Sequence, residues 1–454
     1  MHIHVLGICG TFMSALALIA RDLGHRVTGS DRAAYPPIGP MLQAQGIEVM
    51  PGYDPAHLDP RPDLVVVGNA LSRGNPAVEY MLDARLPYTS GPQWLAQAVL
   101  EKRRVIAIAG THGKTTTTSI VAWILEHAGV DPGFLIGGMP ENFDRAGRLG
   151  GGEWFVIEAD EYDTAFFDKR SKFLHYRPEI LLVNNIEFDH ADIFPDLAAI
   201  ERQFQHLVRT VPGGGRIIRP KPDTVVDRML AQGCWSTQET FGPDAGADWR
   251  YRTQGGGAFD IHRAGAAAGS VLWSMYGEHN TRNATAAIAC AAAAGLEPAA
   301  ACAALATFRA PRRRLERVAE VAGVCIYDDF AHHPTAIAAT IAALRERVGG
   351  ARIIAVFEPR SNSLKMGVQK EQLGPALAGA DMCALFAPPE LPWDLAAETA
   401  GLAARSVDRD LPSLVDRLAG AARPGDHVLV MSNGDFGGIH HRLADRLRAR
   451  AGNA

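Results

Sequence analysis

The stretch that decides the fold of this chain is Arg104–Thr118, RVIAIAGTHGKTTTT. Its apolar first part, Arg104–Ala109, is typical of a strand buried in a parallel sheet. A glycine-rich turn follows, and the residues beyond it have the spacing of an amphipathic helix that continues to His127. Because a strand, a glycine turn and a helix N-terminus in this order can hold a phosphate group, the stretch predicts a nucleotide-binding α/β domain.

The turn GTHGKT carries the groups that a nucleoside triphosphate needs. The backbone from Gly110 to Gly113 can wrap a phosphate, the Lys114 ammonium can contact its β and γ oxygens, and the Thr115 hydroxyl can bind Mg²⁺. A full P-loop has glycine where this chain has Ile108, so the match is to a shorter GTxGKT variant. The alternative is a glycine turn with an incidental lysine. The predicted nucleotide-binding residues are Gly110, Thr111, His112, Gly113, Lys114, Thr115 and Thr116.

Two further apolar runs end in acidic residues. Trp154–Ile157 is followed by EADEYD, in which Glu158 is the candidate second ligand of Mg²⁺. Ile180–Val183 is followed by NNIEFDHAD, which contains Glu187, Asp189 and His190. Because the carboxyl ends of parallel strands meet at one edge of a sheet, these side chains are expected to converge there. The alternatives are a solvated acidic loop and a structural histidine.

Similar α/β patterns flank this central region. In the first segment a strand at Ile3–Leu6, a helix at Ser14–Leu23 and a strand at His25–Thr28 form one βαβ unit, and a strand at 64–68 and a helix at 92–101 follow. The third segment follows PRRRLE and has strands at 324–327, 352–357 and 427–431. The sequence therefore predicts three α/β domains at residues 1–103, 104–310 and 311–454, with a Rossmann-like first domain, a central P-loop ATPase domain and a Rossmann-like third domain.

Two parts of the central region have weaker patterns. Residues 212–269 are rich in Gly, Pro and Ala, so only short strands and loops are expected there. The alanine-rich tract 284–308 is interrupted by Gly295 and Pro298, which favours two packed helices over a membrane span.

Composition excludes several classes of protein. The chain has 454 residues, 47% of them hydrophobic, with mean hydropathy -0.03, which is typical of a multidomain globular protein. Its net charge of -5 gives no field that would attract nucleic acid or a membrane surface. The six cysteines are isolated along the sequence, which disfavours disulfide and zinc frameworks. The N-terminus lacks the basic start of a signal peptide, so a cytoplasmic protein is expected.

The motifs GTHGKTTTT, EADEYD, NNIEFDHAD, GEHNTRNATAA, RRRLE and YDDFAHHPT occur in the same order as in the Mur ligase superfamily, which the chain therefore resembles. This family comprises ATP-dependent amide-forming enzymes of peptidoglycan synthesis, with a UDP-sugar domain, a central ATPase and a third domain that brings the amino substrate. The stretches GICGTFM, GPQWL, EADEYDTAFFDKRSKF, EPRSNSLKMG and MSNGDFGGIH resemble the branch that acts in peptidoglycan recycling.

The resemblance implies a reaction. The lactyl carboxylate of UDP-N-acetylmuramate attacks the γ-phosphate of ATP, and the amine of L-alanyl-γ-D-glutamyl-meso-diaminopimelate displaces phosphate from the acyl phosphate. The products are UDP-N-acetylmuramyl tripeptide, ADP and phosphate. The implied catalytic groups are Lys114, Glu158, His190 and Arg314, with two Mg²⁺ ions held by Thr115, Glu158 and His190.

The resemblance also assigns further contacts with ATP. Its GxHNxxN motif matches Gly277–Asn283. The family also uses arginines of the linker before the third domain and the paired aspartates that follow them. The implied residues are His279, Asn280, Asn283, Arg313, Arg314, Asp328 and Asp329. The asparagines could instead cap a helix. A nucleic-acid patch at the arginines is disfavoured because the chain is acidic and no aromatic residues interleave with them.

The first domain is expected to bind the UDP-sugar. Its turn has GxxGxxM rather than GxGxxG, which disfavours a nicotinamide cofactor, although Asp31 stands where dinucleotide folds place an acid on the ribose. The candidates on this side are Gly10, Thr11, Phe12, Ser30, Asp31, Asn69 and Ser72.

The third domain is expected to bind the amino substrate, with Arg360 as a clamp for a diaminopimelate carboxylate, unless its loop simply faces solvent. The candidates are His332, Arg360, Ser361, Asn362 and Lys365. The pair His332 and His333 is interpreted as a group on the nucleotide or substrate side rather than a metal site, because no acidic partner stands at ligand spacing. His440 and His441 are expected to lie on an ordinary helix face.

One departure from the family pattern concerns the second metal. Several Mur ligases carry a carbamylated lysine after the NxxxDH motif, whereas this chain has no lysine between His190 and Pro220. Charge balance there must come from another group.

Rival hypotheses for the function are an L-alanine-adding ligase, a folylpolyglutamate-synthase-like ligase, a regulatory P-loop ATPase and a dehydrogenase. No nucleic-acid, membrane or obligate protein partner is implied.

Overall fold

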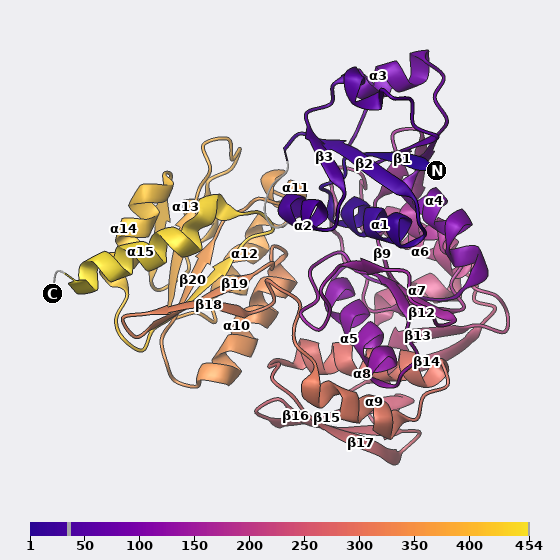
Figure 1. The fold of residues 1–454 in the computed structure, drawn as a ribbon. Helices are drawn as coiled ribbons and strands as arrows, with labels where there is room; N and C mark the ends of the chain where they lie inside the picture. The colour runs from indigo at the N-terminus through magenta and orange to yellow at the C-terminus, as the bar shows by residue number, and fades with distance from the viewer. Residues whose placement is uncertain (34–37, 453–454) are drawn as a thin grey trace.

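The computed structural model describes residues 1–33 and 38–452 and contains three α/β regions (Figure 1). The first domain lies at the top of the view, the second beneath it, and the third to the left. Each has its own sheet, so the predicted α/β class and three-domain architecture are confirmed. No helix in the described ranges is long and apolar enough to cross a membrane.

The first domain is a five-stranded parallel sheet in the order β3-β2-β1-β4-β5. Its elements are β1 (His2–Leu6), α1 (Thr11–Asp22), β2 (Arg26–Asp31), α2 (Ile38–Ala44), β3 (Glu48–Pro51), β4 (Leu64–Val67), α3 (Pro76–Asp83), β5 (Tyr88–Ser90) and α4 (Gly91–Ala98). The predicted helix begins earlier than expected, because Gly10 is already its N-cap. Strand β2 continues to Asp31, which places Ser30 within the sheet.

The second domain is a ten-stranded sheet in the order β17-β16-β15-β14-β13-β12-β6-β9-β7-β8. Its strands are β6 (Arg104–Ala109), β7 (Gly133–Leu135), β8 (Gly147–Arg148), β9 (Trp154–Ala159), β12 (Ile180–Val183), β13 (Arg216–Pro220), β14 (Thr237–Gly242), β15 (Trp249–Gly255), β16 (Ala258–Arg263) and β17 (Ala266–Leu272). Its helices are α5 (Lys114–His127), α6 (Leu197–Val208), α7 (Thr224–Ala231), α8 (Glu278–Ala293) and α9 (Pro298–Ala304). A separate hairpin, β10 (Asp163–Ala165) and β11 (Asp168–Ser171), follows β9.

Helix α5 is buried rather than amphipathic. Even its Thr115–Ser119 segment is buried, because α5 packs against the sheet on one side and against α8 and α9 on the other. The alanine-rich tract forms the two predicted helices, α8 and α9. Small side chains let these helices approach α5 closely, so the prediction of an amphipathic helix was wrong.

The region 212–269 is more ordered than its composition suggests. Strands β13 and β14 extend the parallel sheet, and β15–β17 add an antiparallel meander at its edge. Helix α7 was not expected; the Asp223 carboxylate caps it by accepting hydrogen bonds from the backbone N–H groups of Val225 and Val226. Weak side-chain periodicity is tolerated here because main-chain pairing with neighbouring strands supplies the order.

The third domain is a six-stranded sheet in the order β18-β19-β23-β20-β21-β22, parallel except at β18. Its strands are β18 (Glu316–Val321), β19 (Val324–Asp329), β20 (Ile353–Phe357), β21 (Met382–Phe386), β22 (Arg405–Asp408) and β23 (His427–Met431). Its helices are α10 (Pro334–Val348), α11 (Asn362–Lys365), α12 (Lys370–Leu377), α13 (Leu395–Glu398), α14 (Leu411–Ala421) and α15 (Ile439–Gly452). All three predicted strands are present, as β19, β20 and β23.

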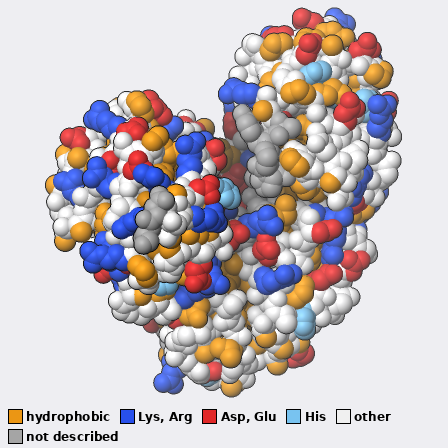
Figure 2. All heavy atoms as spheres, turned by 60° about the vertical axis from the view of Figure 1, so that its left-hand side comes forward, with side chains coloured by type: hydrophobic (Ala, Val, Ile, Leu, Met, Phe, Trp, Pro, Cys, Tyr) orange, Lys and Arg blue, Asp and Glu red, His pale blue; other side chains and the backbone are white. Residues whose placement is uncertain are grey.

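A cleft separates the first and third domains, and the second domain forms its floor (Figure 2). On the side of the first domain, α1 packs directly on β8. A Cβ added to Gly147 would lie 2.2 Å from the Ala15 carbonyl oxygen, so only glycine permits this contact. The described cysteines are all free thiols, as expected.

A buried polar network in the first domain gives stability that depends on pH. The His4 ring contacts the Thr28 hydroxyl at 2.8 Å and the Ser30 hydroxyl at 2.9 Å, and burial lowers its pKa from 6.5 to about 3. Because the unfolded chain binds this proton and the folded chain does not, the contribution is complete above pH 6.5 and is lost as the pH falls towards 3.

We therefore expect a His4→Gln variant, which keeps hydrogen-bonding groups, to lose less stability on acidification. The difference is at most about 1.4 kcal/mol per pH unit below the unfolded pKa. Urea unfolding between about pH 7 and pH 5 measures it. Parallel stability curves for the two proteins would contradict the assignment to His4.

Candidate active site

The site lies where β6, β9 and β12 end. These strands are parallel, with Ile108 paired with Glu158 and Ala109 paired with Val183 and Ala159. The three loops therefore leave the sheet at the same edge. The loops converge as expected from the sequence, and the loop after β12 contacts the third domain.

The phosphate loop is held in place by two asparagines that sequence reasoning missed. The Asn185 carbonyl oxygen Oδ1 accepts a hydrogen bond from the His112 N–H at 2.8 Å, and both Asn184 and Asn185 donate to the His112 carbonyl. Gly113 has φ +80°, and a Cβ there would lie 2.7 Å from Asn184 and from Asn283. The pair Asn184 and Asn185 at the start of NNIEFDHAD was the sequence feature that could have indicated this role.

Thr115 and Glu158 form a compact pair. The Thr115 hydroxyl donates to the Glu158 carboxylate at 3.0 Å, and the Gly137 N–H donates to it at 2.7 Å. Burial raises the pKa of Glu158. A hydroxyl and a carboxylate beside a phosphate loop are the oxygen donors that Mg²⁺ takes, so the residues fit the predicted ion.

Lys114 lies in a cluster of buried charges. Its ammonium is 2.7 Å from Glu161 Oε2 and 3.8 Å from Asp160 Oδ1, and Lys172 binds the same aspartate at 3.0 Å. Burial alone would lower the pKa of Lys114, but the two carboxylates outweigh it and raise the pKa. Lys114 therefore remains a fixed cation. Glu161 and Asp160 are site residues that were missed as individuals, although EADEYD had been singled out.

His190 joins this cluster from the other side. Its Nε2 lies 3.1 Å from Glu161 Oε1, and its ring packs on Tyr162 with centroids 4.2 Å apart. Burial alone would lower the pKa of His190, but the contact with Glu161 raises it. The backbone of His190 is in the left-handed region, with φ +55°. Its role as a metal ligand stays a prediction, and a nitrogen and carboxylates at this spacing fit a divalent ion.

The third domain holds the His190 loop on both sides. The Ser363 hydroxyl donates to Asp189 Oδ1 at 2.6 Å and accepts from the Ala191 N–H at 3.2 Å. The Asn362 side chain donates to Asp192 Oδ2 at 2.8 Å. Helix α11, which follows the candidate clamp Arg360, therefore contacts the residues directly before and after His190.

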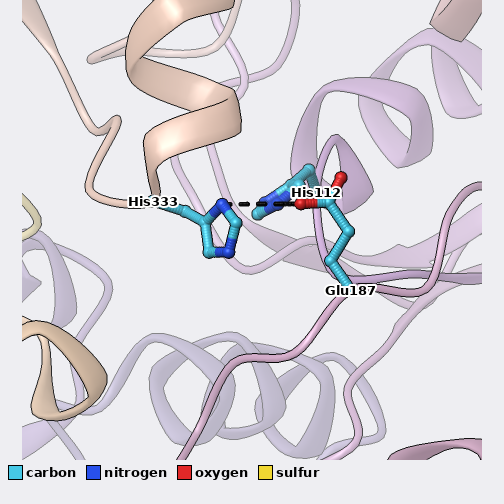
Figure 3. Close-up of side chains that lie close together, drawn as sticks. All are labelled: His112, Glu187 and His333. Carbon is cyan, nitrogen blue, oxygen red and sulfur yellow. Dashed lines mark hydrogen bonds and ion pairs between the residues drawn. The ribbon is translucent and has the colours of Figure 1, made fainter. Parts of the chain in front are cut away.

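Glu187 lies apart from Asp189 and His190. Its carboxylate accepts a hydrogen bond from the Thr335 hydroxyl at 2.7 Å and contacts His112 at 3.4 Å and His333 at 3.6 Å (Figure 3). No acidic partner stands at ligand spacing from the histidine pair in the sequence, but the fold brings Glu187 to His333 from another domain. His332 faces Asp189 instead, at 3.7 Å.

A pocket between the second and third domains adjoins the phosphate loop. Of the residues expected to contact ATP, it is lined by His112, Gly113, Thr116, His279, Asn280, Asn283, Arg314 and Asp329. Burial lowers the pKa of His279 to about 4. Gly277, not an asparagine, is the N-cap of α8, and no side chain caps that helix, so the capping alternative was wrong.

Arg313 does not line this pocket as Arg314 does. Its guanidinium contacts Asp328 Oδ2 at 3.1 Å and donates to the carbonyls of Ser432 and Gly434 at 2.7 Å, so it stabilises the third domain. Asp328 also faces His440 at 3.3 Å, which corrects the expectation of an ordinary helix face for His440.

Asp329 fixes the linker between the two domains. Its carboxylate accepts from the N–H groups of Leu315 and Ala331, and burial raises its pKa.

The candidates in the first domain have different surroundings. The Asp31 carboxylate accepts from the Cys9 N–H at 2.8 Å and so shapes the glycine turn, while Gly10, Thr11 and Phe12 begin α1. The Ser30 hydroxyl is fully buried between His4 and His57, which does not fit the expected contact with uridine. Asn69 and Ser72 follow β4, and their role stays a prediction.

Most candidates in the third domain lie in or next to helix α11, which contacts the second domain. Arg360 is half-exposed and contacts Asp435 at 3.3 Å. Ser361 caps α11, with its hydroxyl accepting from the Leu364 N–H, and Lys365 ends that helix. The roles of Arg360, Asn362 and Lys365 towards a substrate stay predictions.

Family models match in the same order as the three domains. "Mur ligase family, catalytic domain" matches residues 2–103, "Mur ligase middle domain" residues 108–291, and "Mur ligase, glutamate ligase domain" residues 313–434. The chain therefore belongs to the Mur ligase family, as its motifs predicted, and it is an ATP-dependent ligase.

Individual members of the family are similar to the chain over nearly its full length. The chain is 54% identical over 454 residues, 99% of each chain, to the UDP-N-acetylmuramate–L-alanyl-γ-D-glutamyl-meso-2,6-diaminoheptandioate ligase of Escherichia coli (strain K12). The crystal structure of a murein peptide ligase from Psychrobacter arcticus is similar, with TM-score 0.78, 44% identity and 99% coverage of both chains. A UDP-N-acetylmuramate–alanine ligase from Thermotoga maritima shares the fold, with TM-score 0.81 at 22% identity over 99% of this chain and 100% of that chain.

We expect Ser363→Ala to lower kcat about tenfold, because the loop around His190 loses both of its hydrogen bonds to the Ser363 hydroxyl. The Mg²⁺ concentration needed for half-maximal rate should rise, while the KM of the substrate bound by the first domain stays unchanged. Steady-state kinetics with Mg²⁺ titration measures both.

The matched control is Ser406→Ala in β22, whose hydroxyl finds no hydrogen-bond partner among the described residues. Equal kinetic losses in the two variants would mean that Ser363 acts only on the stability of the third domain.

Proposed function

We propose that this chain joins the tripeptide L-alanyl-γ-D-glutamyl-meso-diaminopimelate to UDP-N-acetylmuramate at the expense of ATP, through an acyl phosphate, and so returns cell-wall peptide to peptidoglycan synthesis. The observation that carries the proposal is the buried Lys114, held beside Glu161 in a phosphate loop whose residues His112 and Gly113 line a pocket shared by two domains. The 54% sequence identity to the Escherichia coli ligase, over 99% of each chain, supports the choice of substrates.

Charge is the central difficulty of this reaction, because a carboxylate must approach a triphosphate. Lys114 offers a cation whose position is fixed before the substrates bind, so no reorganisation is needed in the transition state. Arg314 faces the same pocket from the domain linker. Its guanidinium can form paired hydrogen bonds with phosphate oxygens.

ATP and two Mg²⁺ ions are the cofactors we propose. Thr115 and Glu158 would hold the first ion, and His190 with the adjacent carboxylates would hold the second. When bound, the ions neutralise phosphate charge and polarise the transferring group. The family's carbamylated lysine is absent here, and we propose that Glu161, 1% exposed and 3.1 Å from His190, supplies the missing negative charge.

The remaining groups orient the two other substrates. The turn at Gly10–Phe12, together with Asp31, would hold the diphosphate and the sugar of UDP-N-acetylmuramate. Arg360 would bind a carboxylate of the tripeptide. Both substrates are small molecules, and neither nucleic acid nor a membrane nor an obligate protein partner enters the proposal. Use of ATP and a UDP-sugar suits the expected cytoplasmic location.

The test is release of ADP in the presence of Mg²⁺ and ATP. We expect turnover with UDP-N-acetylmuramate plus the tripeptide, and at least about 100-fold slower turnover with UDP-N-acetylmuramate plus L-alanine, because a site built to pair buried polar groups rejects an analogue that lacks them. Faster turnover with L-alanine would assign the chain to the activity named for its 34% identical relatives. Hydrolysis of ATP that is indifferent to both amines would overturn the proposal in favour of a regulatory ATPase.

We expect Lys114→Ala to lower kcat at least about 100-fold, because the transferring phosphate loses its fixed cation. Arg360→Ala should mainly raise the KM of the tripeptide and leave nucleotide binding intact. Kinetics in each substrate and fluorescence titration of nucleotide separate the two effects. Circular dichroism checks that Lys114→Ala folds despite its unpaired carboxylates. Equal loss of nucleotide binding in both variants would refute the role of Arg360.

A further inference from the structure

His112, Glu187 and His333 form a cluster of three side chains of the types that bind metal ions, and the two Mg²⁺ ions proposed above use none of them. They point towards one another from the phosphate loop, from the loop after β12 and from the N-cap of α10 (Figure 3). The first two belong to the second domain and the third to the third domain. Sequence spacing gives no hint of this meeting, because more than seventy positions separate each residue from the next.

The distances suit a small divalent ion. Glu187 Oε2 lies 3.4 Å from His112 Nε2 and 3.6 Å from His333 Nδ1, and the three ligand atoms all fall within 4.8 Å of one another. A tetrahedral ion with bonds of about 2.1 Å holds its ligand atoms about 3.4 Å apart. Two of the three distances between the ligand atoms therefore already suit such an ion.

The chemistry of the cluster selects among ions. Two imidazoles and one carboxylate favour Zn²⁺ and similar transition metals, whereas Mg²⁺ prefers an all-oxygen shell. At His333 and Glu187 the pKa is also shifted towards the unprotonated form, which is the form that binds a metal ion. Burial lowers the pKa of His333 to about 4. Burial alone would raise the pKa of Glu187, but His112 and the Thr335 hydroxyl outweigh it and lower the pKa to about 2.

The surrounding charges distinguish this cluster from the neighbouring one. At Asp160, Glu161 and His190 the ammonium groups of Lys114 and Lys172 already compensate the carboxylates. In the described part of the chain, the ion-pair contacts of Glu187 are with His112 and His333, and neither lysine nor arginine pairs with it. Glu187 accepts a hydrogen bond from the Thr335 hydroxyl, but among the described residues no ammonium or guanidinium group compensates its charge, as two ammonium groups do at the other cluster.

We propose that His112, Glu187 and His333 form a binding site for one transition-metal ion of the Zn²⁺ type, with a fourth position open to the pocket between the domains. Binding at His333 Nδ1 takes the lone pair that now accepts a hydrogen bond from the Thr335 N–H at 3.2 Å. Because the ligands come from two domains, the bound ion holds the second and third domains together. Because His112 and Glu187 line the nucleotide pocket, it also competes with nucleotide.

The experiment uses the full-length protein freed of metal, with Zn²⁺ added in competition with a chromophoric chelator and in the presence of excess Mg²⁺. It needs no substrate, so its outcome is separate from that of the proposed ligation. We expect one Zn²⁺ per chain by equilibrium dialysis, and a rise in Tm on binding. His333→Asn should weaken binding at least about 100-fold and abolish the rise in Tm, because a ligand is lost.

Asparagine is chosen because it is a good N-cap, so the variant without metal should unfold at a temperature close to that of the native chain. The matched control is His332→Asn, one residue away, which should bind Zn²⁺ as the native chain does. The proposal is overturned if no Zn²⁺ binds, or if His333→Asn and His332→Asn bind equally well. It is also overturned if His190→Asn, rather than His333→Asn, removes binding, since the ion would then lie at the other cluster.

Discussion

The site depends on keeping one buried ammonium charged. The Lys114 side chain is only 11% exposed, and removing its charge from water is costly unless a carboxylate lies beside it. Glu161, from the loop after β9, meets that need and also contacts His190, from the loop after β12. One carboxylate therefore connects the ends of three strands, and the phosphate-side groups are placed before any substrate arrives.

The same loops also connect the domains. The segment 187–192 contacts α10 through Glu187 and α11 through Asp189 and Asp192, so two helices of the third domain contact one short loop. A ligase that joins an activated acyl group to an amine must bring the two substrates together while excluding water. Through these contacts the third domain touches the loop that carries His190, which in turn contacts Glu161 beside Lys114.

Much of the fold could be predicted because parallel strands buried on both faces are continuous apolar runs. The strands at β6, β12 and β23 follow from such runs, and GTHGKT predicts the loop after β6. The meander β15–β17 and helix α7 could not be predicted, because their order comes from pairing with neighbours and from one capping carboxylate. Ser30 was misplaced for a related reason: its position after an apolar run did not show that its hydroxyl would be enclosed by two histidines.

The sequence by itself determined the class of protein, the three α/β domains and the local chemistry of each motif, because these depend on residues close together in the chain. The tertiary structure alone decided that Glu161 would join Lys114 to His190, that Asn184 and Asn185 would support the phosphate loop, and that Glu187 would meet His333 across a domain boundary. Such contacts depend on the direction of each side chain at the end of its strand and on how two domains dock. Neither is encoded in the spacing of residues along the chain.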